Sequence, residues 1–157
     1  LEPVVATAVR RNRLEAEGFY ERRRMASGQF VTRDEIETRS PNRVTDLFQM
    51  IPGVQVIPEA MGPTLRLRNG CVPRVVLDGV ILSDPVFIDD IIGAQDLEAV
   101  EVHNASSIPS QYVGQSACGV VMLWTRDAAE LTGGNPPSWR RFAVWIGLAA
   151  ALLVLGG

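Results

Sequence analysis

The side chains that could carry chemistry are few and widely separated in this 157-residue sequence. His103 is the single histidine, and nucleophilic catalysis would need it beside Cys71 or Cys118, with a third group to orient the imidazole. No neighbouring residue supplies that group, so the sequence predicts a surface or loop histidine. A single histidine excludes H-E-x-x-H metal sites, and the absence of Lys excludes the lysine-dependent phosphate loop. We therefore expect no catalytic function and no cofactor.

The two cysteines allow one disulfide. Neither Cys71 nor Cys118 belongs to a C-x-x-C pair, so neither a metal site nor a thioredoxin-type redox pair is indicated. A bridge between them would close a long loop, which stabilises a fold by roughly 3–4 kcal/mol in the chain-entropy model. It would also imply an oxidising compartment. Two unpaired buried thiols are the alternative.

Acidic residues cluster between Val75 and Val102, where no arginine occurs. The stretch could attract a cation or a basic partner, but carboxylates in solvated loops are the favoured interpretation. A calcium loop places glycine at the sixth of twelve positions, and no frame starting at Asp84 or Asp89 does so. The net charge of −3 argues against nucleic-acid binding. The acidic residues of this stretch are Asp78, Asp84, Asp89, Asp90, Asp96, Glu98 and Glu101.

Helix signals occur in the first third of the chain. Thr32 with Glu35 three positions later is a capping box, which predicts a helix from Arg33. Ser40 followed by Pro41 predicts a second helix, with Ser as the cap and Pro at the first helical position.

An apolar face follows the second of these helix starts. Val44, Leu47 and Phe48 recur at helical spacing, which indicates one buried face. Pro52-Gly53 then predicts a turn that ends the helix.

The rest of the chain up to Arg126 is rich in strand signals. Asp78-Gly79 separates two β-branched runs and predicts a hairpin, because a type I′ turn needs the positive φ that Gly supplies. Short helical turns are expected at 94–97 and 107–113. The sequence therefore predicts an α+β fold, with a small mixed β-sheet and short helices. The expected strands are 54–57, 64–68, 74–77, 80–82, 99–102 and 120–125.

The character of the chain changes after Arg126. Residues 127–139 contain the run Gly133 to Pro137, which is typical of a linker. Residues 140–157 are an apolar tail that is uncharged from Phe142 onward. A spanning helix needs about 20 apolar residues, with a lower limit of ~17, and the run from Phe142 to Gly157 is shorter than that. Two alternatives follow: a membrane segment, or a hydrophobic tail that packs on the domain or is disordered.

Several short segments follow one another along the chain in a definite order. They are 1–8, 30–36, Ser40 to Val54 with its closing Pro52-Gly53-Val54, Leu65 to Gly70, Val75 to Val80, Asp96 to Val102, Tyr112-Val113-Gly114 and Cys118 to Arg126. Each segment alone occurs by chance in many proteins. Their order over about residues 1–126 resembles the plug domain of TonB-dependent outer-membrane receptors, with a TonB-box-like stretch at the start and a Gly-Val strand at the end.

The resemblance implies a binding and gating module of a TonB-dependent receptor or transporter. Residues 1–13 are then the TonB-box-like segment and its connector, and residues 14–126 are the plug-like domain. A TonB-type energy-coupling protein is the implied partner, and it would bind the box residues Val4, Val5, Ala6, Thr7 and Ala8 by strand addition. The implied location is the periplasmic side of the cell outer membrane.

Two features depart from the general plug pattern. A barrel of the size found in this family needs several hundred residues, and no stretch of that length follows Arg126 in this sequence; a β-barrel or other membrane protein is one of the partners that the resemblance implies. The cysteines are not part of the pattern either, and a Cys71–Cys118 bridge could brace a plug without a barrel. The rival hypothesis is a free-standing, membrane-tethered interaction or signalling domain that uses the plug fold without transport.

Overall fold

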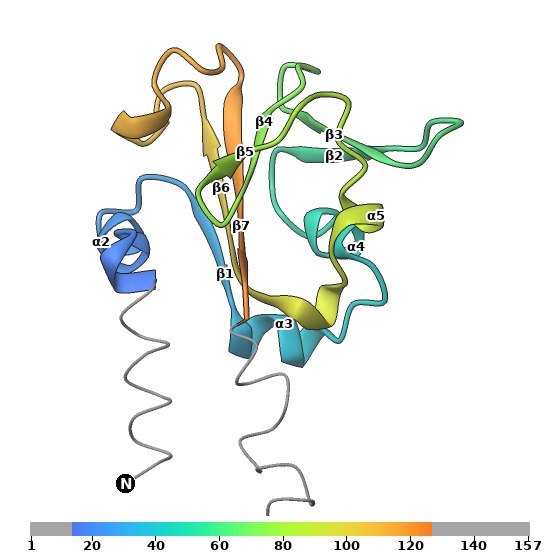
Figure 1. Cartoon of the computed structure of the whole chain (residues 1–157), viewed down its shortest axis with the longest axis horizontal. Coiled ribbons are helices and arrows are strands. Elements are labelled where there is room, and N and C mark those ends of the chain that lie inside the picture. The colour runs from blue at the N-terminus through green and yellow to red at the C-terminus, as the bar shows by residue number, and fades with distance from the viewer. Residues whose placement is uncertain (1–13, 127–157) are drawn as a thin grey trace, which may run out of the picture.

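The computed structural model describes residues 14–126, and these form two sheets and several short helices, an α+β fold as predicted. Figure 1 shows α2 on the left of the larger sheet, with α4 and α5 on its right. In chain order the elements are α2 (Phe19–Arg24), β1 (Gln29–Thr32), α3 (Arg33–Arg39), α4 (Val44–Phe48), β2 (Val54–Ile57), β3 (Thr64–Leu67), β4 (Arg74–Leu77), β5 (Val80–Ile81), α5 (Ile88–Ile91), η1 (Ala94–Asp96), β6 (Leu97–Asn104), η2 (Ser110–Tyr112) and β7 (Gly119–Thr125).

The larger sheet has the strand order β1-β6-β7-β4-β5, and β2 and β3 form a separate two-stranded sheet. Within the larger sheet β4 and β7 run parallel, with Arg74 opposite Val120, and the other neighbouring pairs are antiparallel. The sheet is therefore mixed, as the sequence predicted.

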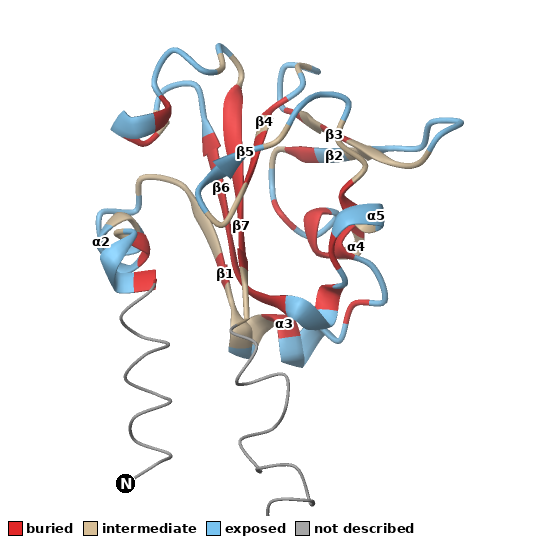
Figure 2. Cartoon of the chain, in the orientation of Figure 1, coloured by how far each residue is buried: buried red, intermediate tan, exposed pale blue. Residues whose placement is uncertain are grey.

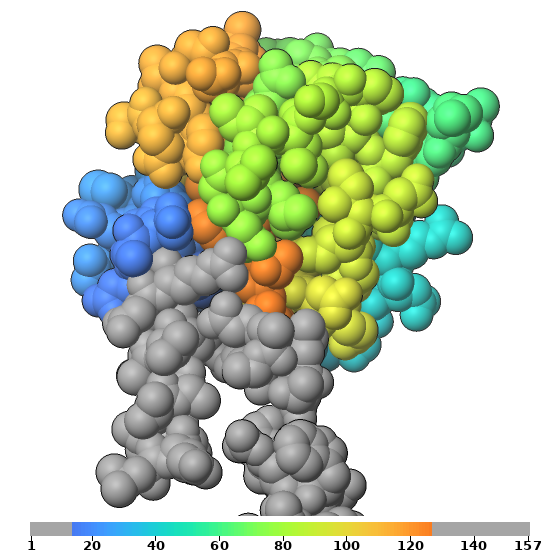
Figure 3. Space-filling view, viewed as in Figure 1, coloured from blue at the N-terminus to red at the C-terminus, as the bar shows by residue number. Residues whose placement is uncertain are grey.

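Both faces of the larger sheet are covered. One face packs on α3, α4, α5 and the small sheet, with Ile36, Leu47 and Leu65 among its buried residues. The other face packs on α2 and η2 through Phe19 and Tyr112. Covering on both faces explains why β6 and β7 are buried along almost their whole length (Figure 2). In Figure 3 the yellow-green segment between β4 and β6 hides much of β7 from view.

The predicted hairpin is confirmed. Asp78 and Gly79 adopt φ values of 49° and 86°, the two positive values that a type I′ turn requires. Beyond the turn, Leu77 pairs with Val80, and Val76 pairs with Ile81. The predicted strands are confirmed as well, with boundaries that differ by at most a few residues.

The first predicted helix start is confirmed, and the second is wrong. The backbone N–H of Thr32 donates to Oε2 of Glu35 at 2.8 Å, so α3 begins at Arg33 as expected. Ser40, however, ends α3 in the left-handed region with φ 44°. The next helix begins at Val44, where Arg43 N donates to Asp46 Oδ2 at 2.9 Å.

The physical reason for this error is local. Ser40 could cap the start of one helix or close the end of the preceding one, and its hydroxyl donates back to the carbonyl of Glu37 at 2.8 Å. The apolar face after it was predicted correctly, since Val44, Leu47 and Phe48 have no exposed surface. The turn at Pro52-Gly53 is also confirmed, and Gly53 has φ 82°.

Candidate functional site

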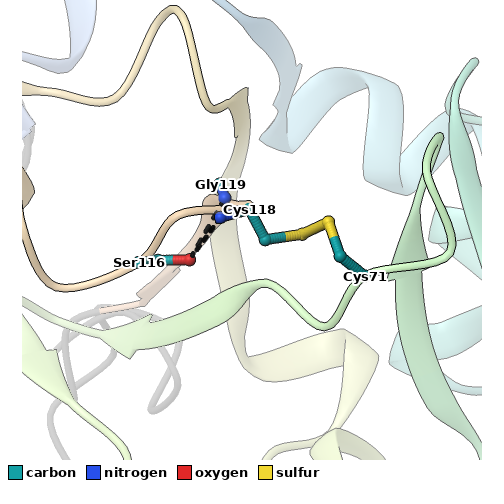
Figure 4. Close-up of a disulfide and its surroundings, with 4 residues drawn as sticks. All are labelled: Cys71, Ser116, Cys118 and Gly119. Atoms are coloured by element: carbon teal, nitrogen blue, oxygen red, sulfur yellow. Dashed lines mark hydrogen bonds between the residues drawn. A yellow bond between two sulfur atoms is a disulfide. The ribbon is translucent and has the colours of Figure 1, made fainter.

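A disulfide joins two loops at one end of the larger sheet. Cys71 precedes β4 and Cys118 precedes β7, and their Cα atoms lie 5.8 Å apart (Figure 4). Because β4 and β7 are parallel neighbours, the loops that lead into them enter from the same end. The Ser116 hydroxyl oxygen accepts hydrogen bonds from the backbone N–H groups of Cys118 and Gly119 at 3.1 and 3.2 Å. The predicted bridge is thus present, and the alternative of two free thiols is wrong.

An open pocket of about 660 Å³ lies beside this disulfide. Its walls come from the segment before β1, the Pro52–Val54 turn, the end of β3, and the loops on either side of η2. Among the described residues that line it, only Arg68 is charged. The polar lining side chains are otherwise neutral: Ser27, Gln29, Asn69, Asn104, Ser106 and Ser107.

Hydrogen bonds fix parts of the pocket wall. Gln29 Nε2 donates to the carbonyl of Pro52 at 2.6 Å, which ties the start of β1 to the turn before β2. Asn104 Oδ1 accepts from the N–H and the hydroxyl of Ser106 at 3.0 and 2.7 Å. Together with the disulfide, these bonds hold a preformed hollow that carries one guanidinium and several neutral hydrogen-bonding groups. Such a hollow suits an anionic or oxygen-rich ligand or partner group.

A smaller and more apolar pocket, of about 340 Å³, lies between β3 and the segment 84–88. Charged side chains line it as well, and they are paired. Arg66 contacts Glu59 at 3.3 Å, and Asp84 contacts Arg74 at 2.7 Å. These contacts leave little free charge here to select a ligand.

The histidine prediction is wrong. His103 lies on β6 with no exposed surface, not on the surface or in a loop. Its Nε2 atom is 2.9 Å from Oε2 of Glu101, and its Nδ1 atom is 3.0 Å from the carbonyl oxygen of Ser27. The ring therefore belongs to a buried polar cluster beneath α2.

Glu101 is the centre of that cluster and is also fully buried. Arg22 on α2 donates to it twice, from Nε at 2.7 Å and from Nη2 at 2.6 Å. Trp124 Nε1 donates at 2.8 Å from β7. Burial by itself would raise the pKa of Glu101, but the hydrogen bonds from Arg22, His103 and Trp124 and the charge of Arg22 outweigh it, so the pKa is lowered. Glu101 is therefore an ionised carboxylate in the domain interior.

This cluster was not predicted from the sequence, although a signal for it was present. Residues at i and i+2 of a strand point to the same face, so Ala99, Glu101 and His103 had to share one side of β6. The distant partner Arg22 could not be predicted, because it depends on how α2 docks.

The interpretation of the acidic stretch as solvated loop carboxylates is wrong for several of its members. Glu98 and Glu101 are buried on β6, because that strand is covered on both faces. Asp89 accepts from the N–H and the hydroxyl of Thr45 at 3.0 and 2.6 Å, which joins α5 to α4. Within the described residues, no three His, Cys, Asp or Glu side chains gather where a metal ion could bind.

Other predicted features fall outside the described part of the chain. The TonB-box-like residues Val4, Val5, Ala6, Thr7 and Ala8 precede residue 14, and the linker and the apolar tail follow residue 126. Among residues 14–126, no helix has the length and apolar character to cross a bilayer.

The sequence profile described as "TonB-dependent Receptor Plug Domain" matches residues 21–120. That range includes the disulfide, the pocket beside it and the buried cluster around Glu101, except for Trp124. No curated protein sequence matches the chain.

Solved structures share the fold. A variant of the ferric enterobactin receptor PfeA from Pseudomonas aeruginosa, in complex with enterobactin, is similar with a TM-score of 0.53 and 20% identity, over 65% of this chain and 18% of that one. The siderophore receptor PirA from Acinetobacter baumannii is similar with a TM-score of 0.53 and 20% identity, over 64% of this chain and 17% of that one. The chain thus spans less than a fifth of the length of either receptor.

Proposed function

Because the match over residues 21–120 shows that this chain belongs to the TonB-dependent receptor plug domain family, we propose that it is the binding and gating module of a TonB-dependent outer-membrane receptor. The family is one of transporter domains, not of enzymes, which agrees with the non-catalytic role expected from the sequence. The observation that carries the proposal is the family match, together with a TonB-box-like segment on the N-terminal side of the matched residues.

The coupling end of the module is the segment 1–13. Val4 to Ala8 are β-prone residues that bind as an added strand to the sheet edge of a TonB-type protein. The chain then passes from this segment into α2, the first labelled element of the described domain. In this arrangement the domain lies in the outer membrane, and its coupling segment faces the periplasm.

The binding end of the module is the pocket beside the Cys71–Cys118 bridge. Its Arg68 guanidinium and neutral polar lining suit an anionic, oxygen-rich cargo or a carboxylate-bearing partner surface. The pocket lies at the end of the sheet where β7 begins, at Gly119. Arg126 follows the opposite end of β7, so the pocket and Arg126 lie at opposite ends of this strand.

A capture experiment tests the coupling role. The full chain, a chain lacking residues 1–9, and the variants Val5→Pro and Glu2→Gln are each exposed to an immobilised TonB C-terminal domain. Val5→Pro removes a backbone N–H that strand addition uses, while Glu2→Gln changes only a side chain outside Val4–Ala8. We expect capture of the full chain and of Glu2→Gln, and loss of capture for the other two. Equal capture of the chains with and without residues 1–9 would contradict the coupling role.

A further inference from the structure

The two ring nitrogens of His103 face two hydrogen-bond acceptors. Nδ1 is 3.0 Å from the carbonyl oxygen of Ser27, a backbone acceptor that has no hydrogen to donate. Nε2 is 2.9 Å from Oε2 of Glu101. The ring has no exposed surface, so solvent water does not replace either partner.

The second acceptor is a carboxylate that is fixed in its ionised form by other groups. Arg22 donates to both oxygens of Glu101, and Trp124 Nε1 donates to Oε1. These donors lower the pKa of Glu101 in spite of its burial. An ionised carboxylate only accepts hydrogen bonds, so Glu101 offers no proton to the lone pair of a neutral imidazole.

A neutral imidazole carries one N–H and one lone pair. It would satisfy either Ser27 or Glu101, and it would direct its lone pair at the other acceptor, a costly contact inside a protein. An imidazolium carries two N–H groups and satisfies both acceptors. The donor count therefore favours the doubly protonated ring.

Packing holds the ring against the segment that joins α2 to β1. A Cβ atom on Gly28 would lie 2.6 Å from His103 Nδ1 and 2.8 Å from the carbonyl oxygen of Val102. The backbone at Gly28 therefore lies so close to the ring that only glycine fits there. The Phe30 ring meets the imidazole edge-on, with centroids 5.7 Å apart. His103 thus contacts both the segment that follows α2, at Ser27 and Gly28, and the strand β1, at Phe30.

We propose that His103 is doubly protonated in the folded domain, and that with Glu101 and Arg22 it forms a proton-dependent latch that holds α2 and the following segment on the sheet. With the proton present, β6 is bonded to the segment through Ser27 and to α2 through Arg22. Loss of the proton breaks one of the two ring hydrogen bonds and loosens the α2 side of the domain. This inference goes beyond the proposed function and does not depend on it.

The groups around the ring are consistent with this charge state. Arg22 is the one other cation in the described cluster, and its positive charge disfavours a second proton on the His103 ring. The Glu101 carboxylate offsets this repulsion, because it is hydrogen-bonded to both Arg22 and His103. On the side of η2, burial and the nearby charge of Glu17 raise the pKa of the Tyr112 hydroxyl, so that group stays neutral at physiological pH. The remaining neighbours, Trp124, Phe30 and the Ser27 carbonyl, do not titrate in this range.

Nitrogen NMR of the full chain tests the protonation state directly. The protein has one histidine, so a ¹⁵N-histidine label gives one imidazole signal set without assignment by mutation. The measurement is made at about pH 8, where a free imidazole is mostly neutral. We expect both ring nitrogens to carry hydrogen and to show the shifts of an imidazolium. A spectrum with one protonated and one bare nitrogen would overturn the inference.

The pH dependence of thermal unfolding supplies a second test, whose sign separates the two states. If folding takes up a proton at His103, stability decreases as pH rises, whereas a ring buried in its neutral form gives the opposite slope. We expect the midpoint Tm of the full chain to fall by roughly 4–8 °C between about pH 6 and 8. His103→Gln should remove this slope, because Gln does not titrate. A flat or rising Tm in the wild type, or an unchanged slope in His103→Gln, would overturn the inference.

Discussion

Asp78, at the tip of the β4–β5 hairpin, accepts hydrogen bonds from both the backbone N–H and the hydroxyl of Thr125, at 2.9 and 2.6 Å. The backbone N–H of Asp78 in turn donates to the carbonyl of Leu123 at 2.9 Å. The residue that forms the turn therefore also fastens the hairpin to the end of β7. Its role is tertiary as well as local.

Replacing Asp78 by alanine should lower the free energy of unfolding by about 1–3 kcal/mol, because two partly buried donors lose a charged acceptor. Thr125→Val removes only the hydroxyl and should cost less. Since the two residues share these bonds, their losses should not add in the double variant. Asp84→Ala is the control, because its pair with Arg74 is exposed and contributes under about 1 kcal/mol. Chemical denaturation measures all four, and equal losses for Asp78→Ala and Asp84→Ala would contradict the assignment.

Features encoded by neighbouring residues were predictable from the sequence. The positive φ of Asp78 and Gly79 and the bond from Thr32 to Glu35 involve residues no more than three positions apart. Their chemistry identifies the turn and the helix start without knowledge of the rest of the fold.

Features that join distant segments were not predictable in the same way. Arg22 and Glu101 are 79 positions apart, and their contact exists only because α2 packs on the face of β6 that carries Glu101. The position of His103 beneath α2 depends on the same docking. The helix start predicted at Ser40 was wrong for another reason, since one polar residue can either begin a helix or end one. A sequence shows which residues could act, but packing decides which of these possibilities is realised.

Removing the Cys71–Cys118 bridge should destabilise the domain substantially. The bridge closes a loop of sequence separation 47, and the chain-entropy model gives about 4 kcal/mol for a loop of that length. The double variant Cys71→Ser/Cys118→Ser should therefore unfold at a lower denaturant concentration than the oxidised wild type. Reductant should lower the stability of the wild type and leave the double variant unchanged. Insensitivity of the wild type to reductant would show that the bridge does not contribute.

Gly28→Ala should destabilise the domain by about 1–3 kcal/mol, the usual cost of overpacking. The new methyl group would approach the His103 ring and the Val102 carbonyl at under 3 Å, and neither atom can move without disturbing β6. Gly93→Ala is the matched control, because its nearest contact is Asp96 Oδ2, the end of a flexible side chain, and its φ is −80°. Thermal unfolding of the two variants compares them. Tolerance of Gly28→Ala would mean that the segment does not pack closely on the ring.

Glu101→Gln should cost about 3–5 kcal/mol at neutral pH, because it leaves the Arg22 charge beneath α2 without its carboxylate. The difference from the wild type should shrink in acid. The folded-state pKa of Glu101 lies below its ordinary value of 4.5, so its contribution to stability is full above about pH 4.5 and is lost as pH falls through the lower folded value. Denaturation curves at a series of pH values measure this difference.

Glu59→Gln is the control for this series, because Glu59 pairs with Arg66 at 3.3 Å on the surface and such a pair contributes little. Its curves should follow those of the wild type at every pH. A Glu101→Gln deficit that stays constant from neutral pH into acid would mean that the ionised carboxylate is not what holds α2 on the sheet. A deficit that closes in acid, with no change in the control, would identify the buried charge of Glu101 as the source of the attachment.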